Sequence, residues 1–548
     1  MIKKYTFVIF YFLRFTAVLL FCIAGCLFTF GLFAQQPTLE WVRTYNSPEN
    51  VPDHFIDMVT DGTGNVYVTG WNVSASNDII TVKYSNSGTL LYGVTYNGAG
   101  NSNDFSNGMA VDSNGNCYVA GYSSFNFGPS DGILIKYSNA GDTVWTRKLA
   151  TNLSDDFTSI AIDINNFIYA AGSSGDSAVV IKFDTTGSIL WRTSYREPPF
   201  NIILGGKILI DRFNNILIGC TKHITSNQYS ADFLVRKYNQ NGSLLWASTY
   251  GNPASVADWM NGFVIDNSGN SYATGYTEVN GRDIITVKFN NNGAINWAKY
   301  YNGLSNAIDQ GNSIICDSIG SNIFITGFTF VTGESRNYIT INYNTLGDTQ
   351  WIRTYNGPGN YQDNAEDIAI DKNLNVYITG ISYISNSDHN TATIKYSIDG
   401  NLQWIERWGD GGDGGKNIIV DNIYNIYNGG EAGVLGPNFL DLFVIKYSQT
   451  TGILIISESI PDKFQLNQNY PNPFNPATNI GFKIKEFGMI KMNIFNSIGE
   501  KIEKLVDQNL YPGEYEIQWN AEKYPSGIYF CLLETDDHKE IIKMILIK

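Results

Sequence analysis

Acidic residues recur at two fixed places in this 548-residue chain and are its clearest candidates for binding chemistry. The first series stands eight residues before a repeated turn aspartate and comprises Asp53, Asp104, Asp155, Asp258, Asp309, Asp363 and Asp413. One repeat has Ile203 there instead. The second series precedes a repeated Lys-Tyr pair by five residues and comprises Asp78, Asp131, Ser177, Asp232, Asp283, Asn337, Asn390 and Asp441.

Two interpretations of these acids stay open. Aromatic residues follow several of them (Phe55, Phe105, Phe157, Trp259), and an acidic, aromatic face could bind a cation, a glycan or a basic partner. Alternatively, each aspartate accepts hydrogen bonds from N–H groups of its own loop, as turn aspartates commonly do. We take the Asp members of both series as candidate ligand-binding residues on one face.

Enzyme motifs are absent from the sequence. The four histidines (His54, His223, His389, His538) have no metal-ligand spacing, and neither a nucleophile elbow nor a phosphate-binding loop occurs. Cys117, Cys220, Cys316 and Cys531 are scattered singly, which predicts buried free thiols. We therefore predict no catalytic residue, no metal and no cofactor, although carboxylates from separate repeats could still form a lyase or glycosidase site.

The elements that would position these residues repeat with a period near fifty. The turn aspartates are Asp61, Asp112, Asp163, Asp211, Asp266, Asp317, Asp371 and Asp421. One repeat shows four strand patterns, at 108–112, 116–121, 131–138 and 142–150. The fourth usually carries a tryptophan (Trp145, Trp191, Trp246, Trp297, Trp351, Trp404), a suitable filler between diverging sheets. Such units predict a β-propeller. A calcium loop at the turn is the alternative, but the downstream acidic ligand is missing.

The repeat count predicts eight blades. Residues 39–46, "LEWVRTYN", look like a fourth strand without the preceding three, so we expect them to complete the blade built from residues 417–447. The patterns "DSNGNCYVAG", "KYSNAG" and "WIRTYNG" resemble the bacterial β-propeller repeat family usually called seven-bladed. The resemblance makes a seven-bladed ring the alternative.

Residues 459–548 break the period and form a separate module after a propeller at 35–458. Short alternating strands predict a small immunoglobulin-like β-sandwich. "YPNPFNP", "IFNSIGE", "YPGEYEIQWN" and "SGIYF" closely resemble the C-terminal sorting domain (type A) of the bacterial type IX secretion system. The resemblance implies the secretion machinery as a partner, passage through the outer membrane, and release or attachment at the cell surface. An immunoglobulin-like binding domain is the alternative.

The N-terminal residues 1–34 predict a signal peptide, with a basic start, an apolar run and cleavage between Ala34 and Gln35. A lipoprotein modified at Cys26 and an uncleaved anchor are alternatives; after cleavage we expect no stable membrane span. The formal charge of −15 argues against nucleic-acid partners. We predict a secreted or surface binding or scaffold protein with a glycan or protein ligand. An exported lyase or glycosidase acting at the propeller mouth, or a structural surface-layer role, are the alternatives.

Overall fold

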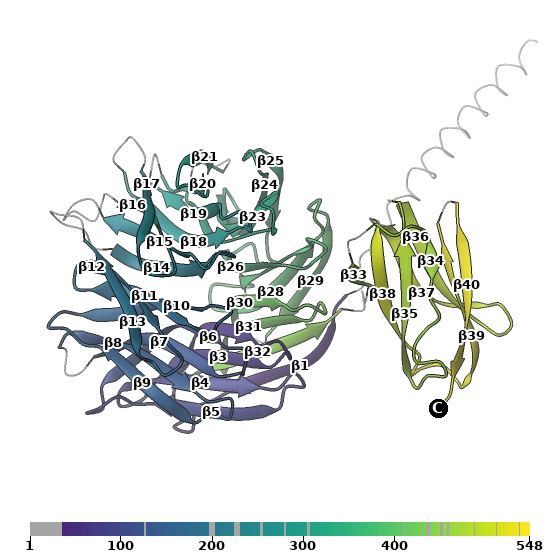
Figure 1. The fold of residues 1–548 in the computed structure, drawn as a ribbon, viewed down its shortest axis with the longest axis horizontal. Helices are drawn as coiled ribbons and strands as arrows, with labels where there is room; N and C mark the ends of the chain where they lie inside the picture. Colours follow the sequence, from purple (N-terminus) through teal and green to yellow (C-terminus); the bar gives the residue numbers. More distant parts are fainter. Residues whose placement is uncertain are drawn as a thin grey trace, which may run out of the picture. The chain divides into compact units, whose positions relative to one another are not determined.

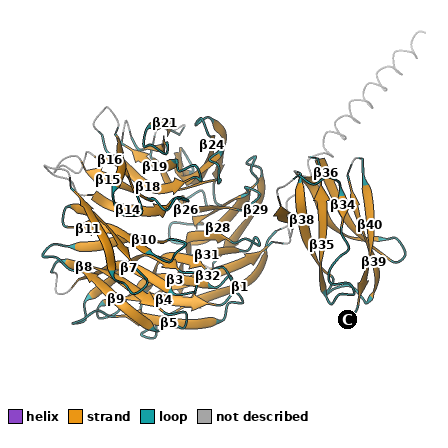
Figure 2. Cartoon of the chain, viewed as in Figure 1, coloured by secondary structure: helices purple, strands orange, loops and turns teal. Residues whose placement is uncertain are grey.

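The computed structural model describes residues 36–124, 128–196, 203–223, 231–251, 256–278, 281–303, 307–409, 411–434, 439–449, 453–457, 460–486, 488–510, 512–535 and 537–548. Strands joined by loops make up these ranges (Figure 2). No helix within them is long and apolar enough to cross a membrane. The predicted signal cleavage at Ala34 and Gln35 lies outside the described residues.

The propeller consists of four-stranded sheets whose strands follow one another in chain order (Figure 1). We number the blades along the chain. Blade 1 consists of β2 (Asp53–Thr60), β3 (Val66–Val73), β4 (Asn77–Tyr84) and β5 (Leu90–Tyr96), and blade 2 of β6 (Asn103–Val111), β7 (Cys117–Ser124), β8 (Ser130–Tyr137) and β9 (Thr143–Leu149). Blade 3 consists of β10 (Asp155–Ile162), β11 (Ile168–Ser174), β12 (Ser177–Phe183) and β13 (Ile189–Tyr195), and blade 4 of β14 (Ile203–Ile210), β15 (Ile216–His223), β16 (Ala231–Tyr238) and β17 (Leu244–Tyr250).

Blades 5 to 7 are built in the same way, and blade 8 takes its fourth strand from the start of the chain. Blade 5 consists of β18 (Asp258–Ile265), β19 (Ser271–Thr277), β20 (Asp283–Phe289) and β21 (Ile295–Tyr301), and blade 6 of β22 (Asp309–Cys316), β23 (Asn322–Val331), β24 (Ser335–Asn344) and β25 (Thr349–Tyr355). Blade 7 consists of β26 (Asp363–Ile370), β27 (Val376–Tyr383), β28 (His389–Tyr396) and β29 (Leu402–Trp408), and blade 8 of β30 (Gly414–Val420), β31 (Ile426–Val434), β32 (Phe439–Ser448) and β1 (Thr38–Tyr45).

Strand β1 closes the ring. It pairs with β32, giving the sheet order β1-β32-β31-β30. The first strands of successive blades contact one another, and β30 contacts β2. Within the described residues the ring therefore has eight blades, closed by residues 39–46 as the sequence predicts, and not the seven of the alternative.

Burial follows each strand's place in its blade. The second and third strands are buried on both faces, as in β4, whereas the outer strand β5 alternates between exposed and covered residues. A sheet packed between two neighbours must be apolar on both sides, which explains the continuous Val/Ile/Tyr runs. The apolar clusters consequently draw on adjacent blades; one joins Tyr67 and Ile79 of blade 1 to Met109 and Val119 of blade 2.

The C-terminal unit is a β-sandwich of two four-stranded sheets. Their strands are β33 (Ile453–Ser457), β34 (Gln465–Leu466), β35 (Ala477–Ile484), β38 (Gly513–Asn520), and β36 (Gly488–Asn496), β37 (Lys501–Leu510), β39 (Gly527–Glu534), β40 (Lys539–Leu546). Its own core includes Trp519, Phe482 and Cys531. Strand β33 lies before the boundary expected at 458/459, yet its hydrogen-bond ladder joins β38.

Candidate functional site

The first acidic series is buried at the start of the first strands. Its seven aspartates are between 0 and 2% exposed. In six of them a backbone N–H of the preceding loop donates to the carboxylate; the pairs are Ser47–Asp53, Gly98–Asp104, Thr151–Asp155, Gly303–Asp309, Gly357–Asp363 and Gly411–Asp413, at 2.5–3.3 Å. These contacts are the ones that the loop-holding interpretation predicts.

The second acidic series lies against the first across the joints between blades. The charge of Asp441 in blade 8 contributes to the raised pKa of Asp53 in blade 1, after burial. The same relation joins Asp78 to Asp104, Asp232 to Asp258 and Asp283 to Asp309. Asp131 instead forms an ion pair with Lys148 at 3.3 Å. Both series therefore lie at one end of the ring.

Aromatic residues near these acids divide into two groups. Phe55 and Phe157 point into the core between blades and are 5% and 1% exposed. Phe105 and Trp259 are only partly buried, because neighbouring strand residues face opposite sides. Phe105 packs edge-on against Trp71, whose ring stacks on His54 at 4.1 Å.

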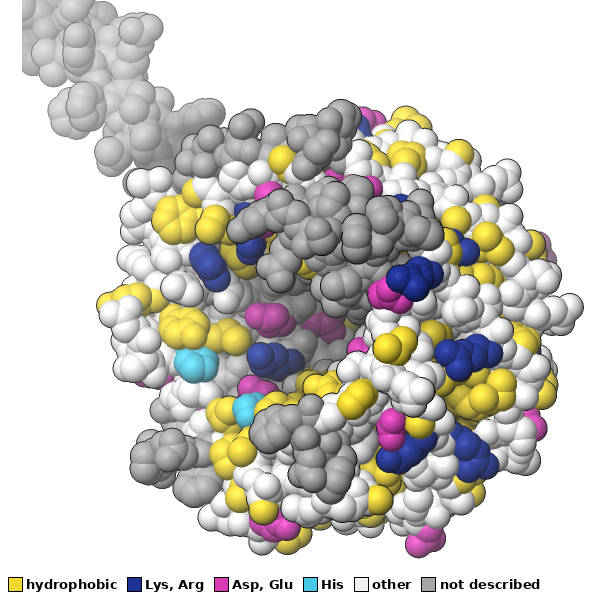
Figure 3. Space-filling model, turned by 90° about the vertical axis from the view of Figure 1, so that its left-hand side faces the viewer, with side chains coloured by type: hydrophobic (Ala, Val, Ile, Leu, Met, Phe, Trp, Pro, Cys, Tyr) yellow, Lys and Arg dark blue, Asp and Glu magenta, His cyan; other side chains and the backbone are white. Residues whose placement is uncertain are grey.

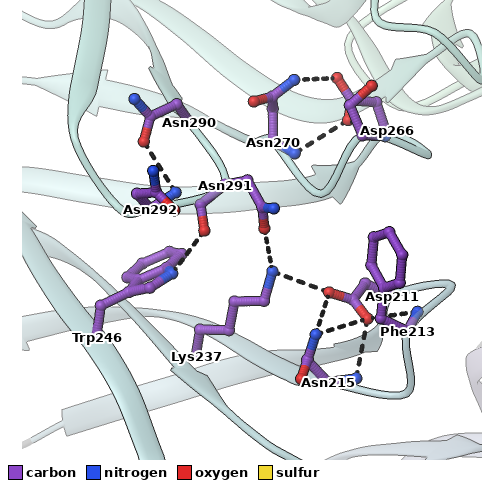
Figure 4. Close-up of polar contacts among 11 residues, drawn as sticks. Asp211, Phe213, Asn215, Lys237, Trp246, Asp266, Asn270, Asn290, Asn291 and Asn292 are labelled. Carbon is purple, nitrogen blue, oxygen red and sulfur yellow. Dashed lines mark hydrogen bonds and ion pairs between the residues drawn. The ribbon is translucent and has the colours of Figure 1, made fainter.

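The turn aspartates take part in the contacts between neighbouring blades. Asp211 accepts the N–H groups of Phe213 and Asn215 at 2.8 and 2.9 Å (Figure 4). Lys237 lies 2.9 Å from the same carboxylate and also contacts Asn291 of the next blade. These donors occupy the carboxylate, so the contacts at this turn are those of a structural turn rather than of a calcium loop.

Tryptophans of the fourth strands make a second set of contacts between neighbouring blades. The indole N–H of Trp246 donates to the carbonyl of Asn291 in the next blade at 2.8 Å (Figure 4). Gly293 in that turn has φ +83°, and a Cβ there would lie 2.6 Å from the Trp246 ring. Equivalent indole bonds occur at Trp41, Trp145, Trp191, Trp297 and Trp351. The predicted role between blades is confirmed for these tryptophans.

A one-residue bulge interrupts the first strand of six blades. Register shifts place Ile56, Asn107, Thr158, Asn261, Asn312 and Glu366 at this position. Three of the asparagines donate to a backbone carbonyl of the next blade, at 2.8–3.0 Å. A cavity of about 720 Å³ is lined by four of these residues, Ile56, Asn107, Thr158 and Asn261, and by Lys207 of β14. Figure 3 shows the hollow at the centre of one face, with acidic and basic side chains inside it.

Five chemically versatile side chains of blades 7, 8 and 1 act on one another by contact or by charge; we call Glu366, Lys416, Glu431, His54 and His389 the charged cluster. Glu366 is the bulge residue of β26, and Lys416 has the corresponding place in β30. The Glu431 carboxylate accepts the Phe55 N–H at 3.0 Å and lies 3.4 Å from His54 Nδ1. His389 stacks on Tyr383 at 4.7 Å. Blades 7, 8 and 1 thus contribute to a single group.

Lys416 is electrostatically linked to three members of the cluster. Burial raises the pKa of Glu366, although the Lys416 charge opposes this shift. Burial would also raise the pKa of Glu431, but His54 and Lys416 outweigh it and hold the pKa below its ordinary value. The pKa of His389 is lowered by burial and by Lys416. The two carboxyl groups therefore differ in their affinity for a proton.

Further charges line the hollow beside the cluster. Asp57 and Asp367 accept backbone N–H groups of the following blade, from Met109 and Ile418, each at 3.0 Å. Burial raises the pKa of both acids, that of Asp57 to about 6, and the charge of Lys207 in blade 4 opposes both shifts. Opposite charges from distant blades therefore meet in the hollow.

The charged cluster is absent from the candidates predicted by sequence. Its signal lies at the position five residues before each turn aspartate, where the repeats have Ile56, Asn107, Thr158, Gly206, Asn261, Asn312, Glu366 and Lys416. Only the last two are charged, and they are neighbours in the ring. Glu431 and His54 do not belong to a series of charged residues that recurs in the repeats. They are also far apart in the chain: Glu431 accepts the N–H of Phe55, which lies 376 residues earlier.

Comparison with known families supports both predicted modules. Residues 468–548 match the secretion system C-terminal sorting domain, and residues 93–128 match the beta-propeller repeat. The sorting domain indicates recognition by the type IX machinery and export across the outer membrane, to the cell surface or the extracellular space.

Individual relatives are distant. Regulatory protein FlaEY of Caulobacter vibrioides is 27% identical over 147 residues, which are 24% of this chain and 14% of that protein. A fungal alcohol oxidase of the AA5 family, in complex with copper, aligns with 93% of this chain and all of its own at 11% identity and a TM-score of 0.40. Sqt1 from Chaetomium thermophilum aligns over 76% of this chain and all of its own, at 10% identity and a TM-score of 0.45.

Proposed function

We propose that this chain, an exported β-propeller followed by a type IX secretion sorting domain, is a binding protein that holds its ligand in the hollow of the propeller. The ligand is a glycan or a protein of the cell surface or its surroundings. The sorting domain delivers the propeller, and the propeller recognises the ligand.

One observation carries this proposal: two neighbouring blades have charged residues at the bulge position of the first strand, where the other blades have uncharged ones. Elsewhere the bulge residues Asn107, Asn261 and Asn312 bond to the next blade. Glu366 and Lys416 replace that type of residue in blades 7 and 8 with charged groups. Ligand sites commonly combine a concave surface with a few convergent polar groups.

Direct binding tests the proposal. The secreted chain, residues 35–548, is applied to a glycan array and to an array of purified envelope proteins, and affinities for the strongest ligands are measured by calorimetry. We expect Lys416→Ala and Glu366→Gln to weaken binding by about tenfold or more, equivalent to about 1.4 kcal/mol.

Lys372→Ala is the matched control, because Lys372 is an exposed lysine in a turn between a first and a second strand. It should bind like the unmodified chain. Equal binding by all four proteins, or binding to neither array, would contradict a ligand site at the charged cluster.

An exported glycoside-cleaving enzyme is the second candidate, favoured by the opposite pKa shifts of Glu366 and Glu431. Acid-base cleavage of glycosides uses two carboxyl groups, one with a raised pKa that acts as the acid and one with a lower pKa. Release of reducing sugar from polysaccharides by the unmodified chain, lost in Glu366→Gln, would favour this candidate over simple binding.

A further inference from the structure

The outer strand of each blade has one edge without a neighbouring strand in the described part of the chain. Such an edge exposes unpaired backbone N–H and C=O groups, and proteins commonly protect it with charged side chains. Six of the eight outer strands contain at least one Arg, Lys or Glu; they are β1, β9, β13, β21, β25 and β29. The other two, β5 of blade 1 and β17 of blade 4, contain no charged residue.

Strands β5 and β17 also begin with exposed apolar side chains. The paired leucines at 90–91 in β5 and at 244–245 in β17 are 47–50% exposed. Strand β13 begins with the similarly exposed Ile189 and Leu190, but the exposed Arg192 follows two residues later. An exposed edge strand that is apolar and uncharged can pair with a strand of another chain. The edges of β5 and β17 are therefore the two candidate contact surfaces on the outside of the ring.

The middle residue of each of these strands is small. It is Ala247 in β17 and Gly93 in β5. When two copies of β17 pair antiparallel about this residue, Ala247 lies opposite Ala247 and Leu245 lies opposite Thr249, so no like charges meet. In β13 the middle residue is Arg192. The same pairing there would place two guanidinium groups opposite each other, which is unfavourable.

We propose that the exported propeller associates with further copies of itself, edge to edge, through β17 and β5. Each edge pairs with the same strand of a second copy, because self-pairing is antiparallel and brings no charge against its like. Two such edges on one ring let association continue beyond a dimer. A pair of seven-residue strands is a small contact beside the standard interface of about 1,600 Å², so we expect weak association. This inference is independent of the proposed ligand in the hollow.

Sedimentation velocity of the secreted chain, residues 35–548, over a series of protein concentrations tests the proposal. We expect the unmodified chain to form dimers and then larger species as its concentration rises. Ala247→Arg gives β17 the residue that β13 has at the same place, and it should stop growth at the dimer that β5 still forms. Adding Thr95→Lys, at an exposed position of β5, should leave monomers only.

Ser194→Lys is the matched control, because Ser194 is an exposed residue of β13, which is already charged; it should not change the distribution of species. Arg192→Ala is the reciprocal variant: it removes the charge from β13 and should shift the chain toward larger species at the same concentration. Thermal melting checks that each variant is folded. A chain that is monomeric at every concentration, or larger species that persist in the Ala247→Arg, Thr95→Lys variant, would overturn the proposal. An unchanged distribution in Arg192→Ala would overturn the role of charge on which it depends.

Discussion

Lys237 and Asp211 form a buried ion pair that most repeats replace with a neutral contact. In blade 3 the Tyr169 hydroxyl donates to Asp163 at 3.0 Å, but blade 4 has Leu217 at that position. In blade 4 the Lys237 ammonium lies 2.9 Å from the Asp211 carboxylate in place of the tyrosine hydroxyl. The side chains of Lys237 and Asp211 are 3% and 0% exposed. One apolar substitution has thus turned a tyrosine contact into a charge pair.

We predict that Lys237→Met lowers the free energy of unfolding by about 3 kcal/mol, because it leaves the Asp211 carboxylate buried without its cation. Lys136→Met is the control: Lys136 contacts the Thr185 carbonyl, while Tyr118 serves Asp112, so the loss should be about 1 kcal/mol. Urea unfolding measures both. Equal losses would contradict a special role for the pair.

The pair should also depend on pH. Burial alone would raise the pKa of Asp211, but Lys237 and Asn215 outweigh it and lower the pKa. A depressed carboxylate pKa stabilises the fold above the unfolded value of about 3.9, and this contribution disappears as pH falls through the lower folded value. The stability gap between the unmodified chain and Lys237→Met should therefore be full at pH 7 and shrink below about pH 4. A gap independent of pH would contradict the assignment.

At the scale of the element, the fourth strand of each blade is attached to the next blade by its tryptophan. Trp246 donates to Asn291 and packs on Gly293. We predict that Trp246→Ala lowers the free energy of unfolding by about 3 kcal/mol, through lost packing and a lost hydrogen bond. Differential scanning calorimetry with and without the substitution measures this. An unchanged melting temperature would mean that the Trp246 indole contributes little to the packing between blades.

The elements were largely predictable from sequence, whereas the site was not. Asp turns, glycines and paired apolar strands repeat locally, so their meaning can be read within one unit. Asp53 and its equivalents repeat as well, but a sequence cannot tell a buried acceptor from an exposed ligand, since both favour aspartate. The charged cluster depends on Glu366, Lys416 and Glu431 of blades 7 and 8 meeting His54 of blade 1, and only closure of the ring brings His54 to the other three. Strand β33 lies before the boundary expected at 458/459 but pairs with β38, and a strand pattern in the sequence does not identify its hydrogen-bond partner.

At the scale of the whole molecule, the two modules have separate cores and separate tasks. We predict that deleting residues 449–548 leaves a folded propeller that stays in the periplasm, because the sorting domain carries the export signal and β33 pairs within it. Immunoblots of periplasm and medium, with proteolysis to check folding, measure the outcome. A truncated chain in the medium at normal levels would contradict the export assignment. Deleting only 460–548 should leave β33 without its partner and make the product more prone to aggregate.

The pairing of β1 with β32 has a consequence for the order of assembly. The first strand to leave the ribosome must wait for a partner that lies some four hundred residues later, so seven blades can form before the ring has a continuous wall. Contacts of such long range slow folding. Until they form, β32 keeps an unpaired edge at the open end of the ring. The pairing of β1 with β32 would then complete the ring and cover an edge that could otherwise pair with another chain.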